Sequence, residues 1–270
     1  MKHKIDAGSE FNLIRDKNVL GSEWLRTYNG YFGDRKNIEL FIRKILPNIR
    51  KKKRLRILYP CSASGILGEN LAKRLREKGV STELVLVDIS KDHLRENRNP
   101  KTKKILADIA GLDLGQLFDI IIMRSSLDYF PGEKLQIRVL SNLNRHLCKD
   151  GVFFNQAASM PSIIERDLAD RIYKSNQRMG RRHFQCKADI EKLYKAAGFG
   201  KLKEIGNGTP LLLTEKEHAK RYEINETQVE RIQKIICEVP AEKRPNIRAT
   251  KKGYEMKFVF PMYAAWKHKD

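Results

Sequence analysis

The chain has 270 residues, enough for one large domain or two modest ones, and 41% hydrophobic residues can supply a buried core. It contains no run of about 18 apolar residues, which excludes an ordinary membrane-spanning helix, and its polar beginning MKHKIDAGSEF lacks the apolar segment of a signal peptide. Four widely spaced cysteines without a CxxC pair argue against a zinc knuckle or a disulfide framework, so we expect a cytoplasmic protein without a metal site.

The net charge of +21 lies mainly at the two ends of the chain. Residues 1–56 carry 15 basic and 6 acidic groups, residues 57–157 carry 15 and 12, and residues 158–270 carry 24 and 15. Basic flanks attract anionic partners such as RNA, nucleotide-bearing metabolites or acidic lipid, but they also serve general solubility. Nucleic acid is therefore one partner that the charge allows.

Predicted helices and strands alternate along the first part of the chain. Residues 18–47 have the apolar spacing of helices. The run RLRILYP (54–60) is typical of a buried strand, and GILGENLAKRLREKG is helical up to Gly79. A second strand, TELVLVDIS, covers 82–90, and KTKKILADIAGL contains a shorter third one.

The alternation continues to the end of the sequence, with β-branched strands and amphipathic helices. The predicted elements are a strand at 117–126, a helix at 134–151 that ends at Gly151, a fifth strand GVFFNQAAS, a helix at 187–198, a strand at 200–206 and a final strand at 254–267.

Strands that alternate with helices indicate βαβ units and a parallel sheet covered on both faces. The predicted fold is α/β and Rossmann-like, with a mostly parallel seven-stranded sheet and helices on both faces. Residues 1–53 are expected to form an N-terminal helical cap and residues 54–270 the main domain. The segments 160–186 and 209–253 interrupt the rhythm after strands five and six, and we expect these insertions to form a substrate lid.

The first strand ends in a turn of small residues, CSASG (61–65). Ligands of open α/β sheets bind beyond the carboxyl ends of the strands, where small residues admit a close ligand and a helix N-terminus offers free N–H groups. Cysteine and alanine can replace glycine in such a turn wherever φ stays negative. NAD is the rival ligand, but its pyrophosphate favours a more glycine-rich turn, so a cofactor without phosphate is favoured.

Acidic residues follow the next two strands. Asp88 ends the second strand, where a carboxylate can accept hydrogen bonds from both ribose hydroxyls, and Asp108 follows the third. Either aspartate could instead cap a helix. With the turn 61–65, the strand FDIIIMRSSLDYF and the helix QIRVLSNLNRHLCKDGVFF, these residues give residues 54–160 a pattern that resembles the class I S-adenosylmethionine-dependent methyltransferases.

The resemblance implies S-adenosylmethionine as cofactor and a role for each matching position. Asp88 would hold the ribose diol and Ile89 would pack on the adenine. Asp108 would accept from the adenine amino group and Ile109 would donate its backbone N–H. The positions implied to lie around the ribose, the methionine moiety and the methyl group are Cys61, Ala63, Gly65, Arg124 and Ser125.

One departure from the family pattern concerns the methionine amino group. The family usually has an acidic residue at the position of Tyr59, and it has glycine at the positions of Cys61 and Ala63. The expected substitutes for the missing acid are Asp34 or a backbone carbonyl.

Candidate catalytic residues lie after the fourth and fifth strands. His183, in MGRRHFQC, could remove a proton from an acceptor at neutral pH, although a surface histidine in a basic turn is the simpler interpretation. Asp128 and Tyr129 could touch the acceptor, although a tyrosine at position 129 is more often a core residue. In WLRTYNGYFGD, Tyr28 is predicted to face the cofactor, whereas Trp24 is explained as well by helix packing.

Three functions are consistent with these features. The first is methyl transfer to a small-molecule acceptor, an anionic one included, because the extra segments lie between core elements. The second is an RNA or protein methyltransferase that uses the basic flanks, and its binding would depend strongly on salt. The third is a protein that binds the cofactor without catalysis.

Overall fold

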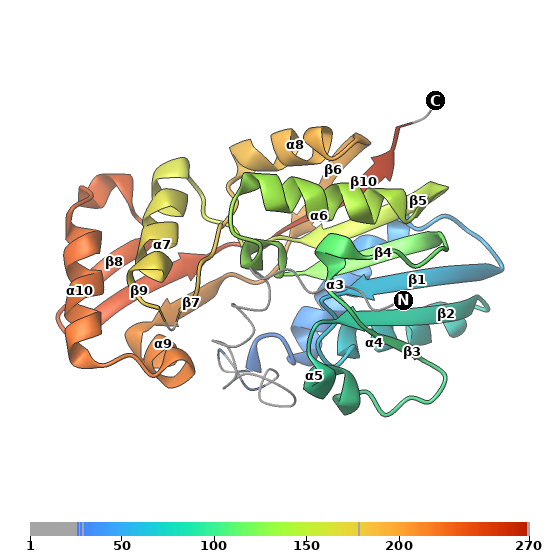
Figure 1. Cartoon of the computed structure of the whole chain (residues 1–270), viewed down its shortest axis with the longest axis horizontal. Helices are drawn as coiled ribbons and strands as arrows, with labels where there is room; N and C mark the ends of the chain where they lie inside the picture. Colours follow the sequence, from blue (N-terminus) through green and yellow to red (C-terminus); the bar gives the residue numbers. More distant parts are fainter. Residues whose placement is uncertain (1–25, 27, 29, 178, 269–270) are drawn as a thin grey trace.

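The structure is a computed structural model, and it describes residues 26, 28, 30–177 and 179–268. The helical prediction for residues 18–25, which includes Trp24, lies outside this part of the chain. The main sheet has seven strands in the order β3-β2-β1-β4-β5-β10-β6 (Figure 1). These strands are β1 (Arg54–Pro60), β2 (Ser81–Asp88), β3 (Lys103–Leu106), β4 (Phe118–Arg124), β5 (Leu147–Gln156), β6 (Phe199–Asn207) and β10 (Pro261–Lys267).

The main sheet is parallel except at one strand. β1 pairs in parallel with β2 and β4, β2 with β3, and β4 with β5. β10 runs antiparallel to both of its neighbours, β5 and β6. The predicted mostly parallel, seven-stranded Rossmann-like sheet is confirmed, and the carboxyl ends of β1, β2 and β4 meet at one edge.

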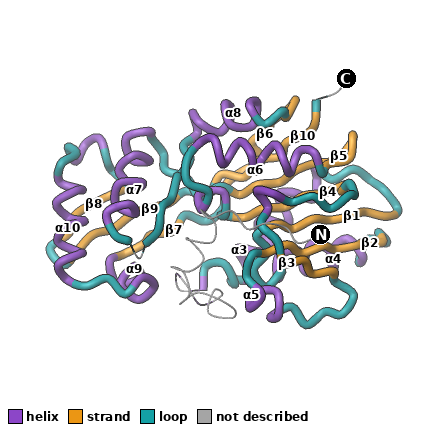
Figure 2. The backbone as a smooth tube through the Cα atoms, viewed as in Figure 1, coloured by secondary structure: helices purple, strands orange, loops and turns teal. Residues whose placement is uncertain are grey.

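Helices cover both faces of the main sheet (Figure 2). Along β4, Ile121 and Met123 pack on one face with α6 (Glu133–Arg145) and α8 (Lys187–Ala196). Ile120 and Ile122 pack on the other face with α3 (Arg35–Ile45) and α4 (Ile66–Arg76), beside the short α5 (Lys91–Glu96). A strand buried on both faces reads as the continuous apolar run that the sequence shows.

A second unit lies beyond the carboxyl edge of the parallel strands (Figure 1). We call it the cap, and it is distinct from the N-terminal helical cap predicted for residues 1–53. Its antiparallel sheet has the order β7-β9-β8, and its helices share one apolar core with that sheet. The elements of the cap are α7 (Ile163–Ser175), β7 (Leu211–Thr214), α9 (Glu215–Tyr222), α10 (Glu226–Cys237), β8 (Ile247–Thr250) and β9 (Gly253–Phe258). α7 comes from the predicted insertion 160–186, and the rest comes mainly from 209–253.

Four chain segments connect the main sheet and its helices to the cap. The first joins β5 to α7, the second joins α7 to α8, the third joins β6 to β7, and the fourth joins β9 to β10. Ser159 on the first segment pairs with Gln185 on the second and with Val259 on the fourth, and the backbone N–H of Gly208 on the third donates to Phe260 O at 2.7 Å. The four crossings are therefore hydrogen-bonded to one another.

Two predicted boundaries are wrong. The single strand expected at 254–267 is two strands, β9 and β10, which belong to different sheets because the chain crosses from the cap to the main sheet at Val259. The helix expected to continue to Gly151 ends at Arg145. Leu147 is buried and pairs with Phe118, so the strand begins before the glycine that the sequence pattern marks as the helix stop.

None of the helices in the described ranges is both long enough and apolar enough to cross a bilayer.

Two glycines offer a matched test of how tightly the turn after β1 is packed. Gly65 and Gly79 both have left-handed backbones, with φ of 76° and 80°. A Cβ on Gly65 would lie 2.3 Å from Leu86 Cδ1, whereas a Cβ on Gly79 meets nothing within 4 Å. We expect Gly79→Ala to lower the free energy of unfolding by about 1 kcal/mol, and Gly65→Ala to lower it by a further ~1–3 kcal/mol through overpacking.

Urea denaturation of the two variants measures this difference. Equal losses in the two variants would show that the clash at Leu86 relaxes without cost.

Candidate functional site

The turn after β1 lines a cavity of about 330 Å³, which we call the loop cavity. Its floor is made of Cys61, Ala63 and Ser64, between the end of β1 and the start of α4. The hydroxyl Oγ of Ser64 is buried and has no hydrogen-bond partner among the described residues. The cavity therefore combines a close backbone approach with a polar atom that a ligand could bind.

The backbone of this turn is left-handed at three of its five residues. φ is 50° at Cys61, 47° at Ala63 and 76° at Gly65. Sequence reasoning allowed Cys and Ala to replace glycine only where φ stays negative, and the structure does not meet that condition. Each of the two non-glycine residues carries strain of about 1–2 kcal/mol. Neighbouring contacts must therefore hold the turn in place.

Asp88 is the residue that holds the turn. Its Oδ2 accepts from the backbone N–H of Ala63 at 2.8 Å, and its Oδ1 accepts from the backbone N–H of Ser90 at 2.9 Å. His93 Nδ1 lies 3.2 Å from the same Oδ1. A carboxylate oxygen has more than one lone pair, so these contacts leave acceptor capacity for a ribose. The predicted ribose contact of Asp88 stays a prediction.

The residues predicted to bind the adenine lie along the same sheet edge but do not line the loop cavity. Asp108 is buried and caps a short 3-10 helix, where it accepts from the backbone N–H of Ala110 at 2.9 Å. Ile109 is buried, and its carbonyl accepts from Asn142 Nδ2 at 2.7 Å. Ile89, next to Asp88, is half-buried. Their contacts with an adenine stay predictions.

Arg124, at the end of β4, lines the loop cavity and is buried. Its Nε donates to Gln156 Oε1 at 2.8 Å, and its Nη1 donates to the carbonyl of Phe32 at 3.1 Å. Its guanidinium carbon also lies 5.4 Å from the centre of the Phe32 ring. Arg124 thus fixes the segment before α3 against the sheet edge and places Phe32 over the loop cavity.

A second cavity of about 380 Å³ lies between the sheet edge and the cap, and we call it the cap cavity. Phe32 lines both cavities. The polar groups of the cap cavity come from Tyr28, Ser125, Asp128, Tyr129, Arg182 and Arg221, and the rest of its lining is mostly aromatic and aliphatic. Enclosure of a few polar groups by apolar walls is typical of a small-molecule site.

The cap cavity contains a buried ion pair. Arg182 Nη1 lies 3.1 Å from Asp128 Oδ2, and the two side chains are 4% and 5% exposed. Burial raises the pKa of Asp128 to about 6, although Arg182 and Arg221 oppose this shift. The guanidinium of Arg182 also stacks 3.3 Å from the centre of the Tyr129 ring. The pair thus joins the turn after β4 to the loop before α8.

Arg221 reaches the cap cavity from α9. Its Nη2 donates to the hydroxyl of Tyr129 at 2.6 Å, and its guanidinium carbon lies 4.6 Å from the centre of the Tyr28 ring. Burial raises the pKa of Tyr28, so this phenol stays neutral at physiological pH. Arginine and tyrosine side chains from three different segments therefore meet here.

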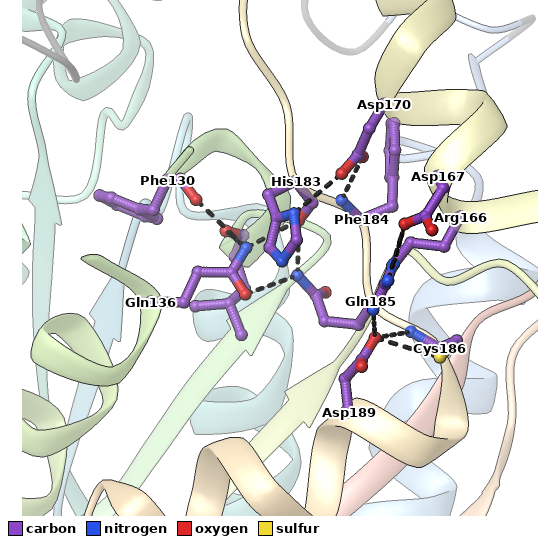
Figure 3. Close-up of polar contacts among 11 residues, drawn as sticks. Phe130, Gln136, Arg166, Asp167, Asp170, His183, Phe184, Gln185, Cys186 and Asp189 are labelled. Carbon is purple, nitrogen blue, oxygen red and sulfur yellow. Dashed lines mark hydrogen bonds and ion pairs between the residues drawn. The ribbon is translucent and has the colours of Figure 1, made fainter. Parts of the chain in front are cut away.

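His183 does not line either cavity. Its Nδ1 lies 2.8 Å from Asp170 Oδ2, and its carbonyl accepts from the side chains of Gln136 and Gln185 (Figure 3). Its backbone N–H donates to the carbonyl of Asp128 at 3.0 Å. The hydrogen bond with Asp170 raises the pKa of His183. These contacts anchor the loop that carries Arg182 and give the imidazole no access to either cavity.

Seven of the predicted site residues line one of the two cavities, and the residues that line neither include Asp88, Ile89, Asp108, Ile109 and His183. Cys61, Ala63 and Arg124 line the loop cavity, with Gly65 at the end of its turn. Ser125 and Tyr28, which were predicted to contact the cofactor, line the cap cavity together with Asp128 and Tyr129. Asp34 caps α3 by accepting from the backbone N–H of Asn37, is exposed, and lines neither cavity, and its role in place of the missing acid stays a prediction.

Sequence reasoning missed Arg221 and Tyr173 in the cap cavity. Arg221 lies in the charged run EKEHAKRY, where no sequence feature distinguishes the one buried arginine from the exposed charged residues beside it. Tyr173 lies on the buried face of α7. Their contribution depends on how the cap docks on the sheet, which local patterns do not encode.

Similar folds occur among solved structures. YcgJ from Bacillus subtilis superposes with a TM-score of 0.69 and 13% identity, over 87% of this chain and all of its own. The N-methyltransferase NodS from Bradyrhizobium japonicum, solved with S-adenosylhomocysteine, has a TM-score of 0.53 and 12% identity, over 96% and 99%. An S-adenosylmethionine-dependent methyltransferase from Clostridium acetobutylicum has a TM-score of 0.51 and 14% identity, over 97% and 100%.

The strand order and these superpositions give the chain the fold of the class I S-adenosylmethionine-dependent methyltransferases. No family model and no curated protein sequence matches it. The similarity of this chain to the solved structures is therefore a similarity of fold.

A buried histidine behind the cap cavity makes the stability of the protein depend on pH. His218 Nε2 lies 3.1 Å from the hydroxyl of Tyr173, and its Nδ1 lies 2.8 Å from the hydroxyl of Tyr254. Burial lowers the pKa of His218 to about 3, helped by the positive charges of Arg221 and Arg182. The folded protein therefore keeps this imidazole neutral under conditions in which the unfolded chain protonates it.

We expect this histidine to weaken the fold below pH 6.5. Between about pH 6.5 and pH 3 it should lower the free energy of unfolding by roughly 1.4 kcal/mol per pH unit. Denaturant titrations of wild type and His218→Gln across this range measure the slope, which should be shallower in the variant. His268→Gln, at an exposed site near the end of the chain, is the control. Equal slopes in wild type and His218→Gln would contradict the expectation.

Proposed function

We propose that the protein is an S-adenosylmethionine-dependent methyltransferase that acts on a small-molecule acceptor. The observation that carries this proposal is the adjacency of the two cavities. Arg124 lines the loop cavity and the next residue, Ser125, lines the cap cavity, while Phe32 lines both. A donor in the loop cavity and an acceptor in the cap cavity would therefore be neighbours at this edge of the sheet.

The loop cavity is the proposed cofactor site. Its small residues Cys61 and Ala63 admit a nucleoside without demanding the glycines that a pyrophosphate favours. The buried Oγ of Ser64, which the described residues leave without a partner, suits the polar methionine end. NodS, which shares the fold, was solved with S-adenosylhomocysteine. With Tyr59 in place of an acid and Asp34 outside the cavity, a backbone carbonyl is the proposed contact of the methionine amino group.

The cap cavity is the proposed acceptor site. Its arginines, Arg182 and Arg221, carry several N–H donors in a fixed planar array that suits a carboxylate or a phosphate. We therefore propose an acceptor that carries an anionic group. A cavity of about 380 Å³, its open mouth included, suits a small molecule better than a polymer.

The residues of the chain contribute position and exclusion of water. When bound, S-adenosylmethionine supplies a methyl group on a positively charged sulfur. Phe32, held by Arg124, limits where the two reactants meet, and orientation of this kind lowers the entropic part of the barrier. The aromatic walls keep water away from a reaction in which charge is neutralised.

Calorimetric titration tests the donor site. We expect S-adenosylmethionine and S-adenosylhomocysteine to bind and NAD not to bind. Asp88→Ala removes the acceptor of the Ala63 N–H and should weaken both ligands by at least about tenfold, which corresponds to roughly 1.4 kcal/mol. Asp92→Ala, at an exposed position on α5, should leave the affinity unchanged. Binding of NAD in preference to S-adenosylmethionine would contradict the proposal.

A further inference from the structure

Asp128 uses only one of its two carboxylate oxygens within the described structure. Oδ2 lies 3.1 Å from Arg182 Nη1, whereas Oδ1 is buried and has no hydrogen-bond partner among the described residues. A buried acceptor of this kind costs about 1–3 kcal/mol when no partner satisfies it. Since Asp128 lines the cap cavity, a ligand there can supply the missing donor.

Ser125 repeats this feature on the same turn. Ser125 lines the cap cavity, and its Oγ is buried and has no hydrogen-bond partner in the described part of the chain. Its backbone is left-handed, with φ of 49°, and its N–H donates to the carbonyl of Gln156 at 2.7 Å. Strained non-glycine residues that their surroundings hold in place are typical of functional sites. Two residues that line one cavity directly after β4 thus each carry a buried polar atom without a partner in the described part of the chain.

The position of this turn relates it to the proposed methyl donor. Ser125 directly follows Arg124, which lines the loop cavity, and β4 is the neighbour of β1 in the sheet. An acceptor held by Ser125 and Asp128 would therefore be bound at the side of the cap cavity that adjoins the loop cavity.

We propose that the acceptor atom is an amine nitrogen, which donates an N–H hydrogen bond to Asp128 Oδ1 and has Ser125 Oγ as its second contact. The inference rests on the proposed methyltransferase function and names the class of its acceptor atom.

The chemistry of the two groups favours an amine over the other nucleophiles. An ionised carboxylate only accepts hydrogen bonds, so the ligand must donate one. A carboxylate acceptor would place a second negative charge against Oδ1. A hydroxyl acceptor would need a much stronger base than Asp128, because an alcohol holds its proton far more tightly than a carboxyl group does. A neutral amine carries both the N–H donor and a reactive lone pair.

The transfer step balances with Asp128 as the proton acceptor. The nitrogen lone pair forms the new C–N bond while the C–S bond breaks and its electron pair stays on sulfur. The N–H proton moves from nitrogen to Oδ1 of Asp128 and passes to water when the product leaves. The charged groups that face Asp128 are Arg182, from the loop after α7, and Arg221, from α9, and both favour its ionised form. The phenols of Tyr28, Tyr129 and Tyr173 complete the titratable lining.

Product chemistry identifies the class of the methylated atom and does not require a purified acceptor. The purified full-length protein is incubated with tritium-labelled S-adenosylmethionine and a protein-free small-molecule extract of the cells that make it. Once the unreacted donor, itself a cation, has been separated, we expect labelled product that binds a cation exchanger at acidic pH and keeps its label in mild base, as methylamines do. Label released by mild base as volatile methanol, or recovered in a product without a basic nitrogen, would overturn the inference and leave the proposed function standing.

Two variants with the same chemical change test the role of Asp128. Asp128→Asn keeps an oxygen for Arg182 but cannot take the proton, so turnover should fall by about 100-fold or more, with the affinity for S-adenosylhomocysteine retained. Asp119→Asn is the control, at the other end of β4, where that carboxylate binds Lys52. Its turnover should equal that of wild type.

The pH profile separates proton transfer from a structural role. Wild-type turnover should fall tenfold per pH unit below about pH 6, and the residual turnover of Asp128→Asn should lack this limb. Wild-type turnover in Asp128→Asn would overturn the inference. Absence of any transfer to the extract would overturn the proposed function and the inference with it, and S-adenosylhomocysteine binding would then distinguish a binding-only protein from one without the cofactor.

Discussion

The arrangement of the whole site depends on one buried cation, the guanidinium of Arg124. It joins the end of β4 to Gln156 on β5 and to the backbone carbonyls of Tyr31 and Phe32. A buried guanidinium needs such partners, because desolvation of an unpaired charge is costly. The hydrogen bonds of Arg124 to these carbonyls hold a segment that is far away in the sequence at the sheet edge, and they place Phe32 between the two cavities. Removal of Arg124 would therefore affect both cavities at once.

The buried pair of Arg182 and Asp128 provides the corresponding link to the cap side. Such pairs are weak contributors to net stability, since desolvation offsets most of the attraction, but the loss of one partner leaves a costly buried charge. This asymmetry fixes the loop that carries Arg182 in one position relative to the turn after β4. The contacts of His183 with Asp170 and with the carbonyl of Asp128 hold the same loop from behind. The cap cavity owes its defined shape to these polar contacts as much as to its apolar walls.

Local patterns in the sequence predicted the main sheet well because both of its faces are buried. The strands that became β1, β2 and β4 are continuous apolar runs, and the small-residue turn at 61–65 lies directly after the first of them. The prediction failed where a local signal had two interpretations. Gly151 has the features of a helix stop but lies inside β5, and the run 254–267 resembles one strand because nothing local marks the crossing between two sheets. The short strands β7 and β8 carry too few residues to show a period.

Part of the site was predictable from the sequence because it follows from the order of the strands. Residues at the ends of strands, such as Asp88, Arg124 and Asp128, could be placed from topology alone, since the carboxyl ends of neighbouring parallel strands meet. The sequence could not predict that Arg124 and its neighbour Ser125 line different cavities. This difference depends on the left-handed backbone of Ser125. Arg221 depends on the docking of the cap. The imidazole of His183 has the chemistry of a base, but in the structure it belongs to a hydrogen-bond network outside the cavities.

The four crossings between sheet and cap limit how the molecule can move. A unit joined to another by one chain segment can rotate about it, but four segments that are hydrogen-bonded to one another leave bending as the easy motion. The cap should therefore tilt as a stiff flap and not swivel, and its tilt would widen the cap cavity more than the loop cavity. Small acceptors and their products would then exchange readily while the nucleoside end of the cofactor stays held, so that turnover could proceed without the cap ever leaving the sheet.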